Sequence, residues 1–380
     1  MIIGIDGNEA NVNKRVGVSV YTYELLKYFQ KSASKDVQFI IYLRNNPGLS
    51  LQDDTGSSMP EESQYFIYRI VKGPLWSQIF VPIDLYLNRK IDVFFSPAHY
   101  TPRFCPVPVV VTIHDLAYEY YPEEFLKEDL YKLKNWTGHA VKQAKKIIAV
   151  SNNTKKDIVK FYHVPEEMIK VIYNGYQQKS KILISKSQIN TKYQILNTKY
   201  LLYVGTIQPR KNLLTLIETF HLLLQDKPDF KLVIAGKKGW MYEEIYQKVK
   251  DLKLTDKIIF TGYINASELS YLYQNASIYI LPSLYEGFGI PLLEAMSNNC
   301  PIVASNISSL PEIGGNACLY FDPNDKMDLK SKIHMILDDE KLRGDLINKG
   351  KERVKEFSWE KCGKETLNIL RNVSSFRFQA

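Results

Sequence analysis

Two glutamates, Glu286 and Glu294, stand eight positions apart in the second half of this 380-residue chain. The apolar residues before them, 276–281, are typical of a buried strand, and Pro291 suits the first position of a helix. We therefore expect a strand–turn–helix unit whose turn lies at the carboxyl edge of a parallel sheet, where open α/β folds bind ligands.

The turn between the two glutamates contains Gly287, Phe288 and Gly289. Backbone N–H groups of Gly289 and Ile290 would face a ligand at the helix start and favour an anion. An ionised carboxylate accepts hydrogen bonds from hydroxyl groups. A sugar nucleotide carries both phosphates and hydroxyls, so it fits this pattern. The alternative is that one glutamate stabilises the helix dipole and the other is simply solvated.

Arg210 and Lys211 follow an apolar strand that begins at residue 200, and they precede a predicted helix that runs to about residue 225. Two cations at a helix N-terminus oppose the helix dipole, so a purely structural role explains them poorly. An anion held between them and the helix explains the placement.

Two further strand ends in the first half of the chain carry candidate site residues. Gly17 lies between the strand at 2–6 and a helix that begins at residue 18, where a glycine lets the backbone approach a phosphate. His114 and Asp115 follow the apolar strand at 107–113. A single histidine in this position is more often structural. No Gly-x-Gly-x-x-Gly follows the first strand, which argues against a nicotinamide dehydrogenase.

The stretch from Glu286 to Ala295, Glu-Gly-Phe-Gly-x-Pro-x-x-Glu-Ala, resembles the Glu-x7-Glu motif of retaining GT-B glycosyltransferases. The loop at Gly17 keeps one glycine of the family's Gly-Gly-x-Gly-x-Tyr loop. Residues 112–115, with Pro122-Glu123 downstream, resemble the acceptor-side loop of family 4 members, particularly mannosyltransferases. The chain is thus identified as similar to family 4 over nearly its whole length, least so at 44–64 and 176–199.

The resemblance implies a role for each candidate residue. Arg210 and Lys211 would stabilise the leaving diphosphate, Glu286 would bind sugar hydroxyls, and Glu294 would bind the ribose. His114 would lie near the transferred sugar and the acceptor, and Tyr263 would lie in a loop against the nucleotide base. The remaining substrate-binding candidates are Gly17, Asp115, Gly287, Phe288, Gly289 and Ile290.

The resemblance also implies an α/β fold of the GT-B type, with two Rossmann-like domains that face each other across a cleft. We expect an acceptor-side domain at 1–175, a linker and entry segment at 176–199, and a nucleotide-sugar-binding domain at 200–356. The residues at 357–380 would form a helix that crosses back to the first domain.

Composition narrows the class of protein. The net charge is +8, with 25 Lys and Arg against 19 Asp and Glu in residues 1–195 and 24 against 22 in the remainder. This excess is too dilute for a nucleic-acid-binding surface. An ordinary solvated surface explains it, and a surface that faces an anionic lipid or a phosphorylated acceptor is the alternative. Four scattered cysteines, no transmembrane run and no signal peptide predict a cytoplasmic protein, with peripheral contact at the inner membrane face as a further hypothesis.

The predicted activity is transfer of a sugar, with retention, from a nucleotide-sugar donor to a glycan or lipid-linked acceptor. By resemblance the donor is GDP-mannose or a UDP-sugar. A GT-B sugar-nucleotide epimerase and a non-catalytic nucleotide-sugar-binding protein are the alternatives. A thermal-shift panel would separate these from a protein that binds no nucleotide.

We predict that catalysis needs no cofactor and no divalent metal. The sequence contains no Asp-x-Asp motif and no clustered Cys and His, whereas Arg210, Lys211 and the helix starts after Gly17 and Gly289 can neutralise a diphosphate. Activity should therefore survive exhaustive EDTA treatment in a transfer assay. Loss of activity with EDTA, and its recovery with Mg²⁺ or Mn²⁺, would contradict this charge assignment.

Overall fold

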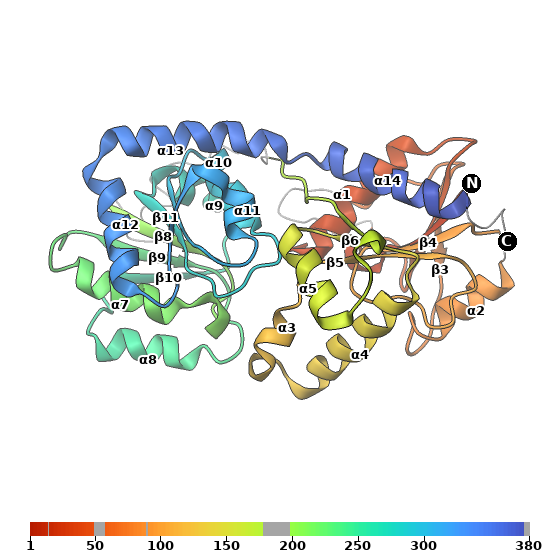
Figure 1. Ribbon diagram of the computed structural model, residues 1–380, viewed down its shortest axis with the longest axis horizontal. Helices are drawn as coiled ribbons and strands as arrows, with labels where there is room; N and C mark the ends of the chain where they lie inside the picture. The colour runs from red at the N-terminus through yellow and green to blue at the C-terminus, as the bar shows by residue number, and fades with distance from the viewer. Residues whose placement is uncertain (14, 49–57, 89, 178–197, 376–380) are drawn as a thin grey trace. The chain divides into compact units, whose positions relative to one another are not determined.

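The computed structural model describes residues 1–380 apart from 14, 49–57, 89, 178–197 and 376–380, and the chain divides into two compact units (Figure 1). Unit 1 comprises Met1–Gln177 and Phe357–Ala380, and unit 2 comprises Gln178–Glu356. The predicted linker at 176–199 lies almost entirely outside the described residues. Each unit is built on its own parallel sheet.

The described part of unit 1 contains a seven-stranded sheet. Its strands are β1 (Ile2–Asp6), β2 (Gln38–Leu43), β3 (Phe66–Ile70), β4 (Val93–Ser96), β5 (Val109–Ile113), β6 (Lys146–Ala149) and β7 (Ile169–Val171), in the order β3-β2-β1-β4-β5-β6-β7. All neighbours pair in parallel. Consequently β1, β4 and β5 end side by side at one edge, at Asp6, Ser96 and Ile113.

Helices cover both faces of this sheet. They are α1 (Val18–Ser32), α2 (Phe80–Leu87), α3 (Ala117–Tyr120), α4 (Lys127–Gln143), α5 (Asn152–Tyr162) and α14 (Trp359–Ser375), with the 3-10 turns η1 (Asn8–Ala10), η2 (Pro122–Glu124) and η3 (Glu166–Met168). Alternate strand residues pack against α1 and α14 on one side, and against α2, α4 and α5 on the other. Ser151 caps α5, since its Oγ accepts a hydrogen bond from the Thr154 N–H at 3.0 Å.

The helix α2 was not expected from the sequence. Residues 80–87 are apolar except for Asp84, so they lack the 3.6-residue alternation by which a surface helix is recognised. The helix α8 in unit 2 (Glu243–Asp251) was not expected from the sequence either.

The described part of unit 2 contains a six-stranded sheet. Its strands are β8 (Tyr200–Val204), β9 (Lys231–Ala235), β10 (Ile258–Gly262), β11 (Ile278–Leu281), β12 (Ile302–Ser305) and β13 (Cys318–Phe321), in the order β10-β9-β8-β11-β12-β13. Besides α8, the helices are α7 (Leu213–Leu223), α9 (Ala266–Asn275), α10 (Ile290–Ser297), α11 (Leu310–Gly314), α12 (Lys326–Asp338) and α13 (Glu340–Arg353), with the turns η4 (Pro209–Lys211), η5 (Gly315–Ala317) and η6 (Val354–Glu356). The neighbouring parallel strands β8 and β11 bring two distant loops to one edge.

The C-terminal helix α14 belongs to unit 1, where it packs against α1 (Figure 1). Gly175 allows this contact, because a Cβ there would lie 2.2 Å from the backbone N of Trp359. The Trp359 ring in turn contacts Tyr21 of α1, with 6.1 Å between ring centroids. No helix in the described part of the chain combines the length and apolar character needed to cross a bilayer.

Two helical glycines provide a matched test of this packing. A Cβ on Gly363 of α14 would lie 2.3 Å from Cγ of Tyr28, whereas a Cβ on Gly344 of α13 would meet no atom within 4 Å. Gly363→Ala should therefore lower the free energy of unfolding by about 1–3 kcal/mol. Gly344→Ala should raise it by about 0.5–1 kcal/mol. Denaturant unfolding measures both values, and equal effects at the two positions would contradict the packing.

Candidate active site

The loop that follows β11 is bonded to η4, the short turn that follows β8. Arg210 donates from Nη1 to the backbone oxygen of Tyr285 at 2.8 Å. In the opposite direction, the Leu284 N–H donates to the Arg210 backbone oxygen at 2.8 Å. The two loops therefore behave as one piece of structure, although they lie about 75 residues apart in the sequence.

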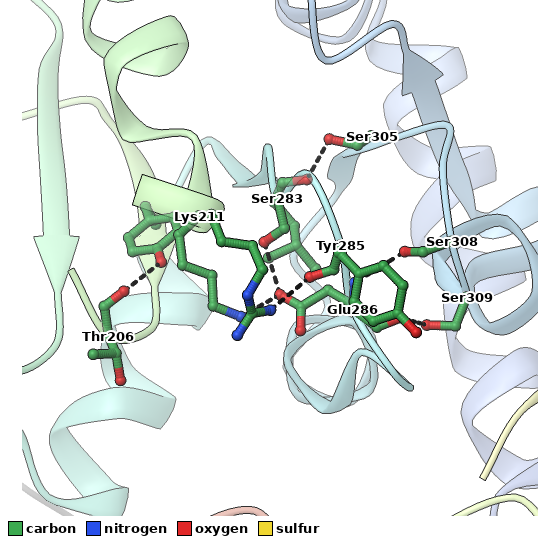
Figure 2. A network of polar contacts seen from close by, with 11 residues as sticks. Thr206, Lys211, Ser283, Tyr285, Glu286, Ser305, Ser308 and Ser309 are labelled. Carbon is green, nitrogen blue, oxygen red and sulfur yellow. Dashed lines mark hydrogen bonds and ion pairs between the residues drawn. The ribbon is translucent and has the colours of Figure 1, made fainter. Parts of the chain in front are cut away.

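Lys211 and Glu286 form an ion pair at the centre of this region (Figure 2). Lys211 Nζ lies 2.5 Å from Glu286 Oε1, and Ser283 Oγ donates to the same oxygen at 2.7 Å. Burial alone would raise the pKa of Glu286, but the charges of Lys211 and Arg210 and the hydrogen bonds from Lys211 and Ser283 outweigh it and hold this pKa below its usual value. Glu286 is therefore ionised at neutral pH.

Two serines of the turn after β12 fix the backbone of Glu286 (Figure 2). The Glu286 N–H donates to Ser308 Oγ at 3.0 Å, and Ser309 Oγ donates to the Glu286 backbone oxygen at 2.8 Å. The sequence analysis missed Ser283, Ser308 and Ser309. The only available signal was the Ser-rich composition of the segment that follows Ser305.

The structure refines the expected environment of the Arg–Lys pair. Arg210 and Lys211 lie in η4, not in the first turn of a long helix, because α7 begins only at Leu213. Between them and α7, Asn212 adopts a left-handed conformation at φ 55°, and its Nδ2 donates to the Pro323 oxygen at 2.9 Å. The repulsion between these cations and the dipole of α7 is therefore weaker than the sequence suggested. The ion pair with Glu286 positions Lys211.

Glu286 was predicted to bind sugar hydroxyls. Its Oε1 is occupied by Lys211 and Ser283, while its Oε2 makes no hydrogen bond with any described residue. One carboxylate oxygen thus orients a lysine and the other remains able to accept from a ligand hydroxyl.

The start of α10 has the geometry that an anion site requires. Gly289 adopts φ 98°, and a Cβ there would lie 2.9 Å from a methyl carbon of Leu310, so glycine is needed for both conformation and space. Within the described structure, the N–H groups of Gly289 and Ile290 donate no hydrogen bond. Gly287 and Phe288, which precede them, are buried. Pro291 occupies the second helical position, one later than predicted.

Glu294 lies in α10 beside buried tyrosines that the sequence analysis did not single out. The Tyr273 hydroxyl donates to Glu294 Oε2 at 3.0 Å, and the Tyr273 ring packs on Tyr279 with 5.2 Å between centroids. Burial raises the pKa of Tyr279 well above its usual value, and the nearby hydroxyl of Tyr203 and the charges of both glutamates raise it further. The two carboxylates thus share one set of buried, protonated tyrosines.

Tyr263 follows β10, and it remains exposed. Gly262 before it adopts φ 69°, and the Lys237 ammonium lies 5.6 Å from the Tyr263 ring centroid. The ring therefore lies at the same carboxyl edge of the unit 2 sheet.

His114 lies at the carboxyl edge of the unit 1 sheet, directly after β5. Its Nε2 lies 2.8 Å from the Pro97 backbone oxygen, and because a carbonyl only accepts, Nε2 carries the proton and Nδ1 the lone pair. Burial and the neighbouring His99 lower the pKa of His114 to about 4, against the Pro97 bond and Asp115, which raise it. The imidazole is therefore neutral at pH 7 and can accept a hydroxyl proton at Nδ1.

Gly17 and Asp115 each have a structural role that was not expected from the sequence. Gly17 caps α1 at φ 53° and ψ −116°, a conformation that favours glycine, although a Cβ would meet no atom within 4 Å. Asp115 Oδ1 accepts the Ala117 N–H at 3.1 Å. Four residues beyond Gly17, α1 places Tyr21 edge-on against His114, at 4.8 Å between centroids.

Asp6, at the end of β1, is a titratable residue of this edge that the sequence analysis missed. Burial raises its pKa to about 7, and Glu9 adds to the rise, whereas a hydrogen bond from the Asn8 N–H at 3.1 Å lowers it. No group of three His, Cys, Asp or Glu side chains among the described residues has the arrangement of a metal site. The expected metal independence stays a prediction.

The structure thus joins Arg210, Lys211 and Glu286 directly, and buried Tyr279 lies near both Glu286 and Glu294. Gly17, His114 and Asp115 form a separate group in unit 1.

Similarity to known proteins covers the segments that carry both groups of residues. The family model described as "Glycosyltransferase Family 4" matches residues 16–178, and that described as "Glycosyl transferases group 1" matches residues 185–353.

Curated relatives extend this match. O-antigen chain mannosyltransferase B of Escherichia coli is 32% identical over 293 residues, which are 74% of this chain and 74% of that protein. O-antigen chain mannosyltransferase RfbU of Salmonella typhimurium is 33% identical over 230 residues, 60% of each chain. Among solved structures, sucrose-phosphate synthase from Thermosynechococcus elongatus superposes with a TM-score of 0.73 at 18% identity, over 98% of this chain and 99% of that one.

The chain belongs to glycosyltransferase family 4, and the predicted GT-B fold class is confirmed. It is therefore a transferase that acts on a sugar. The resemblance on which the sequence analysis relied is confirmed as well.

The raised pKa of Asp6 predicts that this residue lowers the free energy of unfolding in a pH-dependent way. Between pH 3.8, the ordinary pKa of an aspartate, and about pH 7, the unfolded chain loses a proton that the folded chain keeps, so this group lowers stability as pH rises through that window. Asp6→Asn removes the cost, and its gain in unfolding free energy over wild type should grow from about pH 4 to pH 7, by up to about 4 kcal/mol. Denaturant unfolding at several pH values measures it, and a pH-independent difference would rule out the buried carboxyl.

Proposed function

We propose that this chain transfers a mannosyl group from GDP-mannose, with retention of configuration, to a glycan or lipid-linked acceptor. A hexose from a UDP-sugar is the second donor class. The observation that carries the proposal is the Arg210–Lys211–Glu286 arrangement beside the unbonded N–H groups of α10. The choice of mannose is supported by the two O-antigen mannosyltransferases among the relatives.

In this proposal the chain's own residues supply electrostatics and orientation. Arg210, Lys211 and the first N–H groups of α10 stabilise the diphosphate as the sugar–oxygen bond breaks and negative charge grows on the leaving phosphate. Glu286 Oε2 accepts from a hydroxyl of the transferred sugar, and Glu294 accepts from the ribose hydroxyls. Tyr263 and the loop around it would meet the base.

His114 is proposed to receive a hydroxyl hydrogen bond at Nδ1, from the transferred sugar or the acceptor. The leaving phosphate oxygen would take the acceptor proton as the new bond forms on the same face of the sugar, so no enzymic nucleophile is required. No divalent metal takes part in this proposal, because the protein supplies the cations.

We also propose that the protein works in the cytoplasm, in peripheral contact with the inner membrane face. The lysines between residues 142 and 160 are one candidate for that contact: Lys142, Lys145, Lys146, Lys155, Lys156 and Lys160. Three of them have other partners: Lys146 donates to the Glu167 oxygen at 2.6 Å, Lys155 lies 3.0 Å from Glu166, and Lys160 donates to the Tyr120 hydroxyl at 3.3 Å. A different surface is therefore considered below.

The donor class is tested by the thermal unfolding midpoint in the presence of GDP-mannose, GDP, UDP-glucose, UDP-galactose and UDP. A ligand at one hundred times its Kd should stabilise the native state by about 2.7 kcal/mol. Product anomeric configuration, determined by NMR with the preferred donor, tests retention. Stabilisation by no nucleotide would overturn the proposal, and conversion of the donor to an epimer without transfer would favour the epimerase.

Glu294→Ala should weaken donor binding about tenfold or more, because a hydrogen bond to a charged group contributes roughly 1.5–3 kcal/mol. Tyr273→Phe should have a smaller effect, since it removes only the hydroxyl that orients Glu294 Oε2. Glu340→Ala is the matched control, because that glutamate is exposed at the start of α13. Isothermal titration with the preferred nucleotide measures all three, and unchanged affinity in a folded Glu294→Ala protein would remove Glu294 from the site.

A further inference from the structure

One side of α2 and the segments before and after it exposes large apolar side chains. The helix lies beside β3 in unit 1 (Figure 1), and Arg69 of β3 is paired with Asp84 of α2 at 2.6 Å. We call the following exposed residues the α2 surface: Leu75, Ile79, Ile83, Tyr86, Leu87 and Phe104. Leu87 and Phe104 are 79% and 76% exposed.

This helix is apolar on both sides, which is unusual for a surface helix. Val81 and Leu85 pack into a buried cluster with Trp76 and Val107, so the inner side already serves the core. The outer side is also apolar, with exposed side chains at Ile79, Ile83 and the last helical turn. A helix that is apolar all round is normally covered on every side. The exposed side therefore indicates a covering partner.

Two of the exposed side chains are held in place by backbone that disfavours them. Leu75 adopts φ 47° and Phe104 φ 53°, a region that glycine and asparagine normally occupy. The segments that carry them are joined, since Gln78 Nε2 donates to the Thr101 oxygen at 3.1 Å, and Cys105 packs on the same buried cluster as α2. Strained positions persist where function requires them, so apolar residues here point to a role outside the fold.

The charges around the α2 surface are positive. Residues 66–107 contain five Lys and Arg against two Asp and Glu. Both acids have partners, because Asp84 binds Arg69 and Asp92 Oδ2 accepts the Ile2 N–H at 2.8 Å. Lys72 and Lys90 are exposed and Arg103 is partly exposed. An occupant of this surface must therefore be apolar within and anionic at its rim.

We propose that the α2 surface docks on an anionic lipid bilayer, with its apolar side chains inserted at the level of the headgroups and its cations against lipid phosphates. Tyr86 suits that interface, where aromatic rings with one polar end gather. A second copy of the chain would bring like charges together across a two-fold axis, which disfavours it as the occupant. The inference gives a location to the peripheral contact proposed above, and it does not depend on the identity of the donor.

The test is sedimentation of the full chain with vesicles of phosphatidylglycerol and phosphatidylcholine, and with phosphatidylcholine alone. Wild type should bind the anionic vesicles, and binding should weaken with added salt. Leu87→Glu and Phe104→Glu should each reduce the partition coefficient about tenfold or more, because each exchanges a buried apolar side chain for a charge. Leu126→Glu is the matched control: Leu126 is 71% exposed just before α4 and does not belong to the α2 surface, so binding should not change.

Both charged variants alter exposed side chains, so unfolding midpoints close to wild type should establish that they fold. Equal vesicle binding by wild type and both variants, or no binding by wild type, would overturn the proposal. Dimers in sedimentation velocity that Leu87→Glu abolishes would also overturn it, in favour of a second copy. Nucleotide binding should be unchanged in both variants, so a failure of the donor assignment remains distinguishable from a failure here.

Discussion

The ion pair between Lys211 and Glu286 determines the geometry of the carboxyl edge of unit 2. It joins the turn after β8 to the loop after β11, and both partners are largely buried. Removing one partner of such a pair leaves a buried charge without compensation, which costs about 3–5 kcal/mol. The pair therefore acts as a clamp, and it keeps the lysine oriented and the pKa of the glutamate below its usual value before any ligand arrives. Preorganised charge of this kind needs little rearrangement when negative charge develops in a reaction.

Hydrogen bonds around the clamp limit its freedom further. Ser283 bonds to the carboxylate, while Ser308 and Ser309 bond to the backbone of the same glutamate. Because these bonds occupy one carboxylate oxygen and both backbone groups, the second carboxylate oxygen is left in a defined direction. Glu294 is held separately, by the hydroxyl of Tyr273, whose ring packs on Tyr279. The clamp and its three serines are thus a connected polar network, in which each member restricts the next.

In unit 1 the candidate site residue His114 is held by packing, whereas in unit 2 Lys211 and Glu286 are held by their opposite charges. Tyr21 lies between His114 and Trp359, so the C-terminal helix supports the histidine through α1. Burial keeps the pKa of His114 low, and the Pro97 oxygen sets its tautomer. The last helix of the chain is therefore part of the support of a residue near the middle of unit 1, which accounts for the close approach at Gly175 and Gly363.

The sequence by itself determined the family, the fold class, and the strand–turn–helix segments that carry Gly17, His114, Arg210 and Glu286. These depend on short-range patterns: apolar strands, glycines at turns, and the spacing of two glutamates. It did not determine that Lys211 bonds to Glu286, because that contact spans 75 residues and depends on β8 and β11 being neighbours. Nor did it reveal α2, the raised pKa of Asp6 or the shared tyrosines. Burial and exposure of these groups depend on which elements pack over them, and that is decided only when the tertiary structure brings distant segments together.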